Sequence, residues 1–305
     1  MSAQHSMQNT KRSQITIRPA TVDDAAACGR ITHDAFSTIS ADHGYPSDFP
    51  SAEEAFEFLS AMFSTSGYHG LVAEHHAEGQ EGAQTAGSCV VGEQDVVQSI
   101  GPISVDTHLQ KSGTGRRLLE AAISRMRSNG AIGMRLVGAA FNNGSFSLYT
   151  SLGFDVREPL SCLQGRTHTR HVEGCVVRPA TAADMADCNT LSRKIHGFAR
   201  ESMLSQAVSD GTARVVSREG KVTGYATSLG YFGHATAETN LDIQALLADV
   251  DSGSFESAGI LVPTRNSDLL RWCLANGLRV VQPMTLMTMG FYREPAGAWL
   301  PSVLY

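Results

Sequence analysis

Segments with helical periodicity and segments with strand-like alternation follow one another along the chain. Residues 113–128 place Leu118, Leu119, Ala122, Ile123 and Met126 at spacings of three and four, which predicts an amphipathic helix. Further helices are predicted at 23–40, 52–64 and 145–152, and strands at 15–18, 70–74, 87–91, 99–106, 134–140 and from 154 onwards as one strand or a pair. An opening block of strands followed by alternating strands and helices predicts an α/β domain with a mixed sheet.

The chain contains an internal repeat. Residues 15–32 read ITIRPATVDDAAACGRIT and residues 175–192 read CVVRPATAADMADCNTLS, with seven identical aligned positions. Each copy predicts a short strand that ends at proline, followed by a threonine cap with aspartate three residues on, the pattern of a capping box. A second correspondence, between NNGSFSLYTSLGF at 142–154 and NSDLLRWCLANGL at 266–278, closes each copy. We therefore predict two domains of common origin, at 14–164 and 175–305, joined by a linker at 165–174.

The segment 105–117, VDTHLQKSGTGRR, has the order that a phosphate site requires: a β-rich stretch, a polar turn and the start of a helix. Gly113 and Gly115 allow close approach of the backbone, and the first N–H groups of a helix favour an anion. Lys111 and Arg116 add positive charge beside the turn. A glycine-rich connector that only caps the helix is the alternative, because a lone G-x-G is a weak signal. The turn lacks both the Walker pattern and the third glycine of a dinucleotide fingerprint.

Three blocks of sequence together resemble the GNAT superfamily of N-acetyltransferases. The chain reads R-P-A-T-x-x-D at 18–24, Q-x-x-G-x-G at 110–115 and N-x-x-S-x-x-L-Y-x-x-x-G-F at 142–154, in the family's order. Thr107 stands where the family has proline in V-x-P, and the similarity covers residues 15–160. The resemblance implies an α/β (α+β) fold of two tandem GNAT-like domains, each a mixed, mostly antiparallel twisted sheet flanked by helices.

The resemblance also implies an activity, the transfer of an acetyl or other short acyl group from acetyl-CoA to a primary amine of a small molecule or peptide. In this family the backbone of Ile103 and Val105 would hold the pantetheine arm of coenzyme A. Tyr149 would lie beside the sulfur as general acid, although a tyrosine that merely packs its helix is the alternative. The implied pyrophosphate site comprises Gln110, Lys111, Ser112, Gly113, Thr114, Gly115 and Arg116, and Asn142 and Ser145 would line the far wall.

The sequence singles out no general base. His108 lies next to the glycine turn, Glu74, His75 and His76 end a predicted strand, and Asp106 follows Val105. Each of these is equally well explained as a solvent-facing polar residue. Deprotonation of the amine through water requires none of them.

The second copy departs from the pattern. Where the phosphate turn is expected, residues 231–240 read YFGHATAETN, and Glu238 and Asp242 are unsuitable neighbours for a pyrophosphate. Cys273 occupies the tyrosine position, without an evident basic partner to make it a catalytic thiol. We predict a degenerate domain that keeps the fold and has lost the cofactor. Its aromatic tail, residues 291–305, is expected to pack, either near the acceptor cleft or simply between domains.

Composition narrows the remaining classes of partner, location and function. The net charge of −6 argues against a nucleic-acid partner, and no apolar run approaches the ~20 residues of a membrane span. Six scattered cysteines are expected to be reduced thiols of a cytoplasmic protein, without a metal site. The polar residues 1–13 carry no secretion signal and are expected to form a disordered arm. An oligomer is possible, and the alternative functions are a non-catalytic acyl-CoA-binding or regulatory protein and, more remotely, nucleotide binding.

Overall fold

The computed structural model describes residues 14–77, 82–251 and 253–304, so the arm predicted at 1–13 lies outside the described residues. The first half of the chain contains β1 (Gln14–Pro19), η1 (Val22–Asp24), α1 (Ala25–Asp42), α2 (Ala52–Ser64), β2 (Tyr68–His76), β3 (Gln84–Gly92), β4 (Val97–Val105), η2 (Thr107–Leu109), α3 (Thr114–Ser128), β5 (Gly133–Ala139), α4 (Asn143–Ser151) and β6 (Asp155–Gly165). The second half contains β7 (Val176–Pro179), η3 (Ala182–Asp184), α5 (Met185–His196), α6 (Glu201–Ser209), β8 (Arg214–Arg218), β9 (Lys221–Ala226), β10 (Ala235–Ala237), α7 (Asn240–Ala248), β11 (Phe255–Pro263), α8 (Ser267–Ala275), β12 (Leu278–Gly290) and β13 (Ala298–Leu300).

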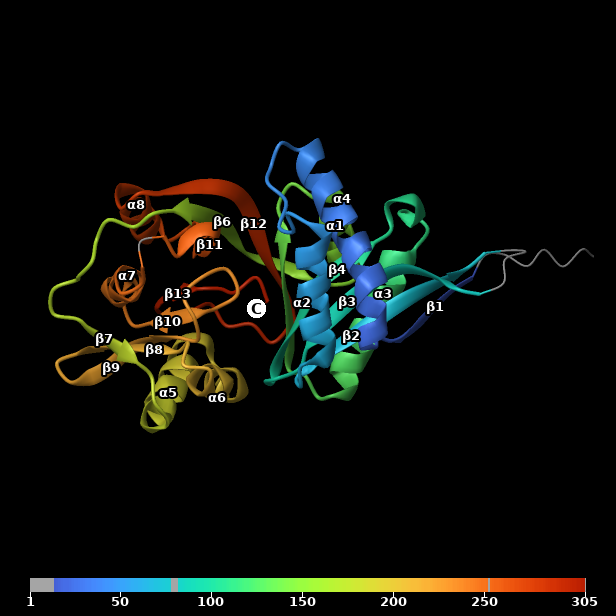
Figure 1. Ribbon diagram of the computed structural model, residues 1–305. Coiled ribbons are helices and arrows are strands. Elements are labelled where there is room, and N and C mark those ends of the chain that lie inside the picture. Colours follow the sequence, from blue (N-terminus) through green and yellow to red (C-terminus); the bar gives the residue numbers. More distant parts are fainter. Residues whose placement is uncertain (1–13, 78–81, 252, 305) are drawn as a thin grey trace, which may run out of the picture.

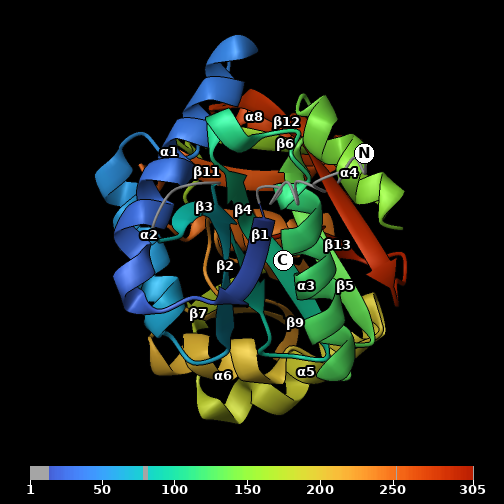
Figure 2. The ribbon, with the colours of Figure 1, turned by 90° about the vertical axis from the view of Figure 1, so that its right-hand side faces the viewer.

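The strands form two sheets. An eight-stranded sheet has the order β1-β2-β3-β4-β5-β12-β6-β11, and a five-stranded sheet has the order β13-β10-β9-β8-β7. Neighbouring strands are antiparallel except β4 and β5, which run parallel. Helices α1 and α2 lie against one face of the larger sheet and α3 against the other (Figure 2). The predicted fold class, mostly antiparallel sheet flanked by helices, is confirmed.

Hydrophobic periodicity locates the core of the first half correctly. The five apolar residues that predicted the helix at 113–128 are all buried in α3, where they pack against β-strand residues such as Val91 and Leu136. Burying a leucine or methionine side chain contributes about 2 kcal/mol. The packing of this face therefore fixes α3 on the sheet, and with α3 the position of the turn that precedes it.

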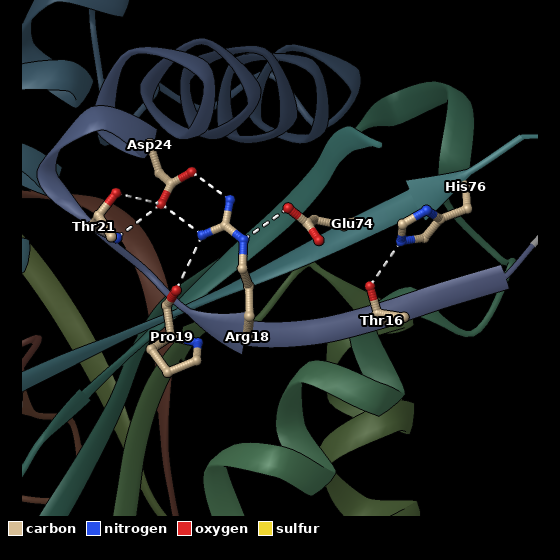
Figure 3. A network of polar contacts seen from close by, with 7 residues as sticks. All are labelled: Thr16, Arg18, Pro19, Thr21, Asp24, Glu74 and His76. Atoms are coloured by element: carbon tan, nitrogen blue, oxygen red, sulfur yellow. Dashed lines mark hydrogen bonds and ion pairs between the residues drawn. The ribbon is translucent and has the colours of Figure 1, made fainter. Parts of the chain in front are cut away.

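Figure 3 shows the conformation that the repeated R-P-A-T-x-x-D motif encodes. The Arg18 guanidinium donates to both carboxylate oxygens of Asp24, at 2.7 and 2.8 Å, and Asp24 accepts the Thr21 amide at 2.8 Å. Arg178 and Asp184 repeat these contacts at 2.6 and 2.8 Å. The hydrogen bonds from the Arg18 guanidinium lower the pKa of Asp24 to about 2, and those from Thr21 act in the same direction. The motif is thus a structural device that ties the first strand of each copy to the helix that follows.

The two halves exchange their last strands. Strand β6 runs from the first half into the second, and β12 runs from the second half into the first (Figure 1). In each copy this strand follows the helix that closes the repeat, α4 in the first and α8 in the second. Strand β12 pairs with β5, with Thr285 opposite Gly138, while β6 pairs with β11, with Cys162 opposite Leu261. Strands β6 and β12 also pair with each other. The eight-stranded sheet therefore contains strands from both halves of the chain. The domain boundary at the linker predicted at 165–174 stays a prediction from sequence.

Candidate functional site

A cavity of about 570 Å³ opens where β4, β5, α1, α3 and α4 converge. Pockets of this size accommodate small-molecule ligands. Most of the predicted site residues lie on its wall: Ile103, Val105, Gln110, Lys111, Gly113, Gly115, Arg116, Asn142, Ser145 and Tyr149. The structure thus brings together segments that the sequence spreads over more than forty positions.

Ser112 and Thr114 serve the turn itself rather than the cavity wall. The Ser112 hydroxyl donates to the Leu109 carbonyl at 2.5 Å and lies 2.8 Å from the Thr114 hydroxyl. Thr114 is buried at the first position of α3. Their side chains therefore tighten the turn, and only their backbone amides are suited to contact an anion.

The turn between β4 and α3 has a backbone shape that explains its two glycines differently. Gly113 precedes α3 in the left-handed conformation, at φ +89°, which side chains rarely adopt. Gly115 has no such strain, and a Cβ there would lie 3.4 Å from Leu148 Cδ2 and 3.6 Å from Val105 Cγ2, at ordinary contact distance. Gly113 is required by the turn, whereas Gly115 keeps the cavity wall bare. The N–H groups of the first turn of α3 lack intrahelical acceptors, which suits this wall to an anion.

Tyr149 lies on α4 with its side chain almost wholly buried, at 8% exposure, and lines the cavity. Its ring lies near Gly138 of β5, whose Cβ position is 3.5 Å from Tyr149 Cε2. Burial raises the pKa of the Tyr149 phenol to about 12, although a hydrogen bond with the Ser145 side chain opposes that shift. The phenol therefore stays protonated at neutral pH and is available as a hydrogen-bond donor.

Asn142 has a local structural role besides its place on the wall. Its Oδ1 accepts the Ser145 amide at 3.0 Å and caps α4. Asn266 caps α8 in the same way, accepting the Leu269 amide at 3.3 Å. Helix capping therefore explains why both copies have asparagine at this position, and the asparagine by itself does not indicate a cofactor.

Asp48, which lies in the loop between α1 and α2, is a cavity residue that the sequence analysis missed. Its carboxylate accepts hydrogen bonds from Tyr231 Oη at 3.1 Å and Gln282 Nε2 at 3.0 Å. Burial raises the pKa of Asp48, and these two hydrogen bonds oppose the shift. No spacing rule could have found the group, because 234 positions separate Asp48 from Gln282.

The second half of the chain supplies one wall of the cavity through Tyr231, Phe232, Met284, Val303 and Leu304. The Phe232 ring lies 5.6 Å from that of Phe58 on α2. The expectation that the tail packs near the cleft of the first half is met by Val303 and Leu304. The wall is thus shared between the halves.

The acid–base candidates considered from sequence lie away from this wall. The lining, as far as the structure describes the chain, includes none of Glu74, His75, His76, Asp106 and His108. Glu74 accepts a hydrogen bond from the Arg18 guanidinium at 2.7 Å, and His76 lies 3.0 Å from the Thr16 hydroxyl (Figure 3). Asp106 accepts the His108 amide at 2.8 Å. The side chains of Glu74, His76 and Asp106 have structural partners instead.

In the second half, the positions that correspond to the candidate site of the first half have structural roles. Cys273 is fully buried on α8, and burial raises the pKa of its thiol to about 12, which makes it unreactive. Asp242 caps α7 through Thr239 and forms an ion pair with Arg218 at 2.7 Å.

No helix among the described residues is both long and apolar enough to cross a membrane.

Comparison with known proteins gives a family match that lies within the first half of the chain. Residues 34–154 match the sequence model of the acetyltransferase (GNAT) family. This match extends over α2, β2 to β5, α3 and α4, and so includes most of the cavity wall that the first half provides. A search of curated proteins gave no match.

Two solved structures are similar to the chain over nearly its whole length. A putative acetyltransferase from Pyrococcus horikoshii is 19% identical, with a TM-score of 0.67, and the match covers 97% of this chain and 98% of that one. A GCN5-related N-acetyltransferase from Sphaerobacter thermophilus is 14% identical, with a TM-score of 0.58, covering 92% of this chain and 96% of that one. At this identity the likeness concerns the fold, which both halves share with these relatives. The chain thus carries a domain of the acetyltransferase (GNAT) family, matched over residues 34–154.

Proposed function

We propose that the protein transfers an acetyl or other short acyl group from acetyl-CoA to a primary amine of a small molecule or peptide. One observation carries the proposal: the end of β4, the bare turn before α3 and the buried phenol of Tyr149 line the same cavity. The family match over residues 34–154 supports it. The predicted cytoplasmic location fits the six buried free cysteines.

The coenzyme would be held mainly by main-chain groups. The amides of the β4–α3 turn face the pyrophosphate, and Lys111 and Arg116 on the same wall supply positive charge. Arg116 is oriented by its hydrogen bond to the Ser151 hydroxyl at 2.7 Å, which ties α3 to the end of α4. Ile103 and Val105 lie on β4 beyond Ser99, where the described pairing with β5 ends, and their main chain would pair with the pantetheine arm.

Acyl transfer would proceed by direct attack. The neutral amine nitrogen forms a bond to the thioester carbonyl carbon, the carbon–sulfur bond breaks, and the nitrogen loses a proton as the sulfur gains one. Tyr149 donates a hydrogen bond to the departing thiolate and passes its proton to the sulfur, and the proton lost by the nitrogen restores the phenol through solvent. The products are the N-acyl amine and coenzyme A thiol.

Turnover with the Tyr149→Phe variant tests this assignment. Release of coenzyme A thiol is measured with acetyl-CoA and a panel of primary amines, and coenzyme affinity is measured by calorimetry. We expect the variant to lower kcat by about a hundredfold or more while affinity stays within about twofold. Tyr68→Phe, at a half-buried tyrosine outside the cavity wall, is the matched control. An unchanged kcat would remove Tyr149 from the mechanism, and coenzyme binding without thiol release for every amine would favour the non-catalytic alternative.

A further inference from the structure

The cavity contains a carboxylate whose two oxygens have different surroundings. Both donors to Asp48, Tyr231 Oη and Gln282 Nε2, reach the same oxygen, Oδ1. Among the hydrogen bonds of the described residues, none involves Asp48 Oδ2. Asp48 is half-buried and lines the cavity. One oxygen is therefore fixed by the second half of the chain, and the other remains available to a ligand.

The surroundings of Asp48 are apolar and mostly aromatic. Phe36 lies 5.2 Å from Phe49, Phe49 5.6 Å from Phe58, and Phe58 5.6 Å from Phe232, measured between ring centroids. All four residues line the cavity, together with Val303 and Leu304 of the tail. A carboxylate in such surroundings attracts a cation strongly, because little water screens it.

Charge is distributed unevenly around the cavity. The basic residues of the described lining are Lys111 and Arg116, and both belong to the turn before α3 and its first helical turn. The acidic ones are Asp42, at the end of α1, and Asp48, in the loop that follows. An anionic ligand such as a phosphate is thus favoured at one part of the wall and a cationic ligand at the other.

Strand β12 connects the Asp48 part of the wall to the part around Tyr149. Met284 lies two residues after Gln282, on the same face of the strand, and pairs with Ala139 at the end of β5. Met284 and Ala139 both line the cavity. The neighbour of Ala139 is Gly138, whose Cβ position is 3.5 Å from the Tyr149 ring. Because neighbouring residues of a strand point to opposite faces, Asp48 and Tyr149 approach from opposite faces of β5, and both line the same cavity.

We propose that Asp48 binds the ammonium group of the acceptor, which makes the acceptor a primary amine carried on an aromatic or aliphatic body. This inference rests on the proposed function and assigns its amine site. Tyr231 and Gln282 are positioning residues, because they hold Oδ1 and aim Oδ2. The second half of the chain thereby completes the acceptor site of the first.

The same group gives the amine a route to its reactive form. The bound ammonium R–NH₃⁺ gives one proton to the Asp48 carboxylate, and the resulting R–NH₂ attacks the thioester as described above. The nitrogen loses its second proton when the carbon–sulfur bond breaks, and that proton balances the one gained by sulfur. Asp48 then releases its proton to solvent, so that the overall reaction yields amide, thiol and one proton.

A binding measurement and a kinetic one together test the inference. The probe is 2-phenylethylamine, titrated by calorimetry into the coenzyme A-loaded protein and used as acceptor with acetyl-CoA. We expect Asp48→Asn to weaken probe binding and raise the KM for the probe by tenfold or more, with coenzyme affinity unchanged. Asp34→Asn, the same change on the exposed side of α1, is the control and should alter neither. Tyr231→Phe should raise the KM less than Asp48→Asn does.

The outcomes separate this inference from the proposed function. Turnover of the probe with equal KM in the wild type and Asp48→Asn overturns the anchor but leaves the acyltransfer in place. Absence of thiol release with every amine overturns the function, and calorimetry then still decides the anchor through the loss or persistence of probe binding in Asp48→Asn. Absence of probe binding to the wild type overturns the anchor. Phenylalanine, which adds a carboxylate to the probe, should bind more weakly than 2-phenylethylamine, and equal binding of the two would contradict an anionic anchor at Asp48.

Discussion

The two glycines of the β4–α3 turn allow a ligand-binding role to be separated from a structural one. Gly115→Ala adds a methyl group 3.4 Å from Leu148 Cδ2, which the free protein accommodates without a clash. Because Gly115 is helical and alanine is the better helix former, the variant should be as stable as the wild type or more stable by up to about 1 kcal/mol. The methyl group nevertheless occupies the wall against which the pyrophosphate would lie.

Gly113→Ala should behave in the opposite way in the free protein. Gly113 has φ +89° and nothing within 4 Å of its Cβ position, so the cost is one of backbone strain alone, about 1–2 kcal/mol. Gly130→Ala is the matched control, because Gly130 has φ +75°, is equally open and lies at the far end of α3. The two variants should lose similar stability, but only Gly113→Ala should also weaken coenzyme binding.

Urea unfolding of the free protein and calorimetric titration with coenzyme A measure these effects. Loss of one hydrogen bond to a charged phosphate is worth about 1.5–3 kcal/mol, so Gly115→Ala should weaken coenzyme affinity by at least about tenfold. Gly130→Ala should leave that affinity within about twofold of the wild type. A Gly115→Ala protein that is stable and binds coenzyme A as tightly as the wild type would show that the turn is only a connector between strand and helix.

Two further predictions concern the repeat. In Asp24, whose pKa is about 2 against an ordinary 3.8, the ionised form is stabilised by Arg18, so this stability is present above about pH 4 and lost as the pH falls toward 2. Because Arg18 is 38% exposed, we expect Asp24→Asn to lower the free energy of unfolding by only about 1 kcal/mol at pH 7. In urea titrations this difference from the wild type should vanish near pH 2. An equal loss of stability at both pH values would contradict the ion pair. Cys273→Ala should leave kcat unchanged and cost about 1–2 kcal/mol through the small cavity it creates, and the native wild-type thiol should resist iodoacetamide; loss of turnover in the folded variant would reveal a catalytic role.

Local features of the fold could be predicted from the chain because short-range contacts encode them. The spacing of Leu118, Ala122 and Met126 predicts α3, and the Arg18–Asp24 pair and its copy each lie within seven residues of sequence. The same holds for the left-handed glycine before α3, since backbone conformation at Gly113 depends on its immediate neighbours. The turn that forms part of the candidate site could therefore be identified before its surroundings.

Only the tertiary structure decided how the two halves combine. Strands β6 and β12 follow equivalent helices in the two copies, so hydrophobic alternation does not say which of them pairs with β5. Their exchange brings Gln282 and Tyr231 to Asp48, a grouping that no sequence spacing announces. Strand pairing and cavity walls depend on contacts between residues that are distant in sequence. These contacts form only when the whole sheet forms. The turn that we propose faces the coenzyme was thus a property of the sequence, and the amine site we propose is a property of the fold.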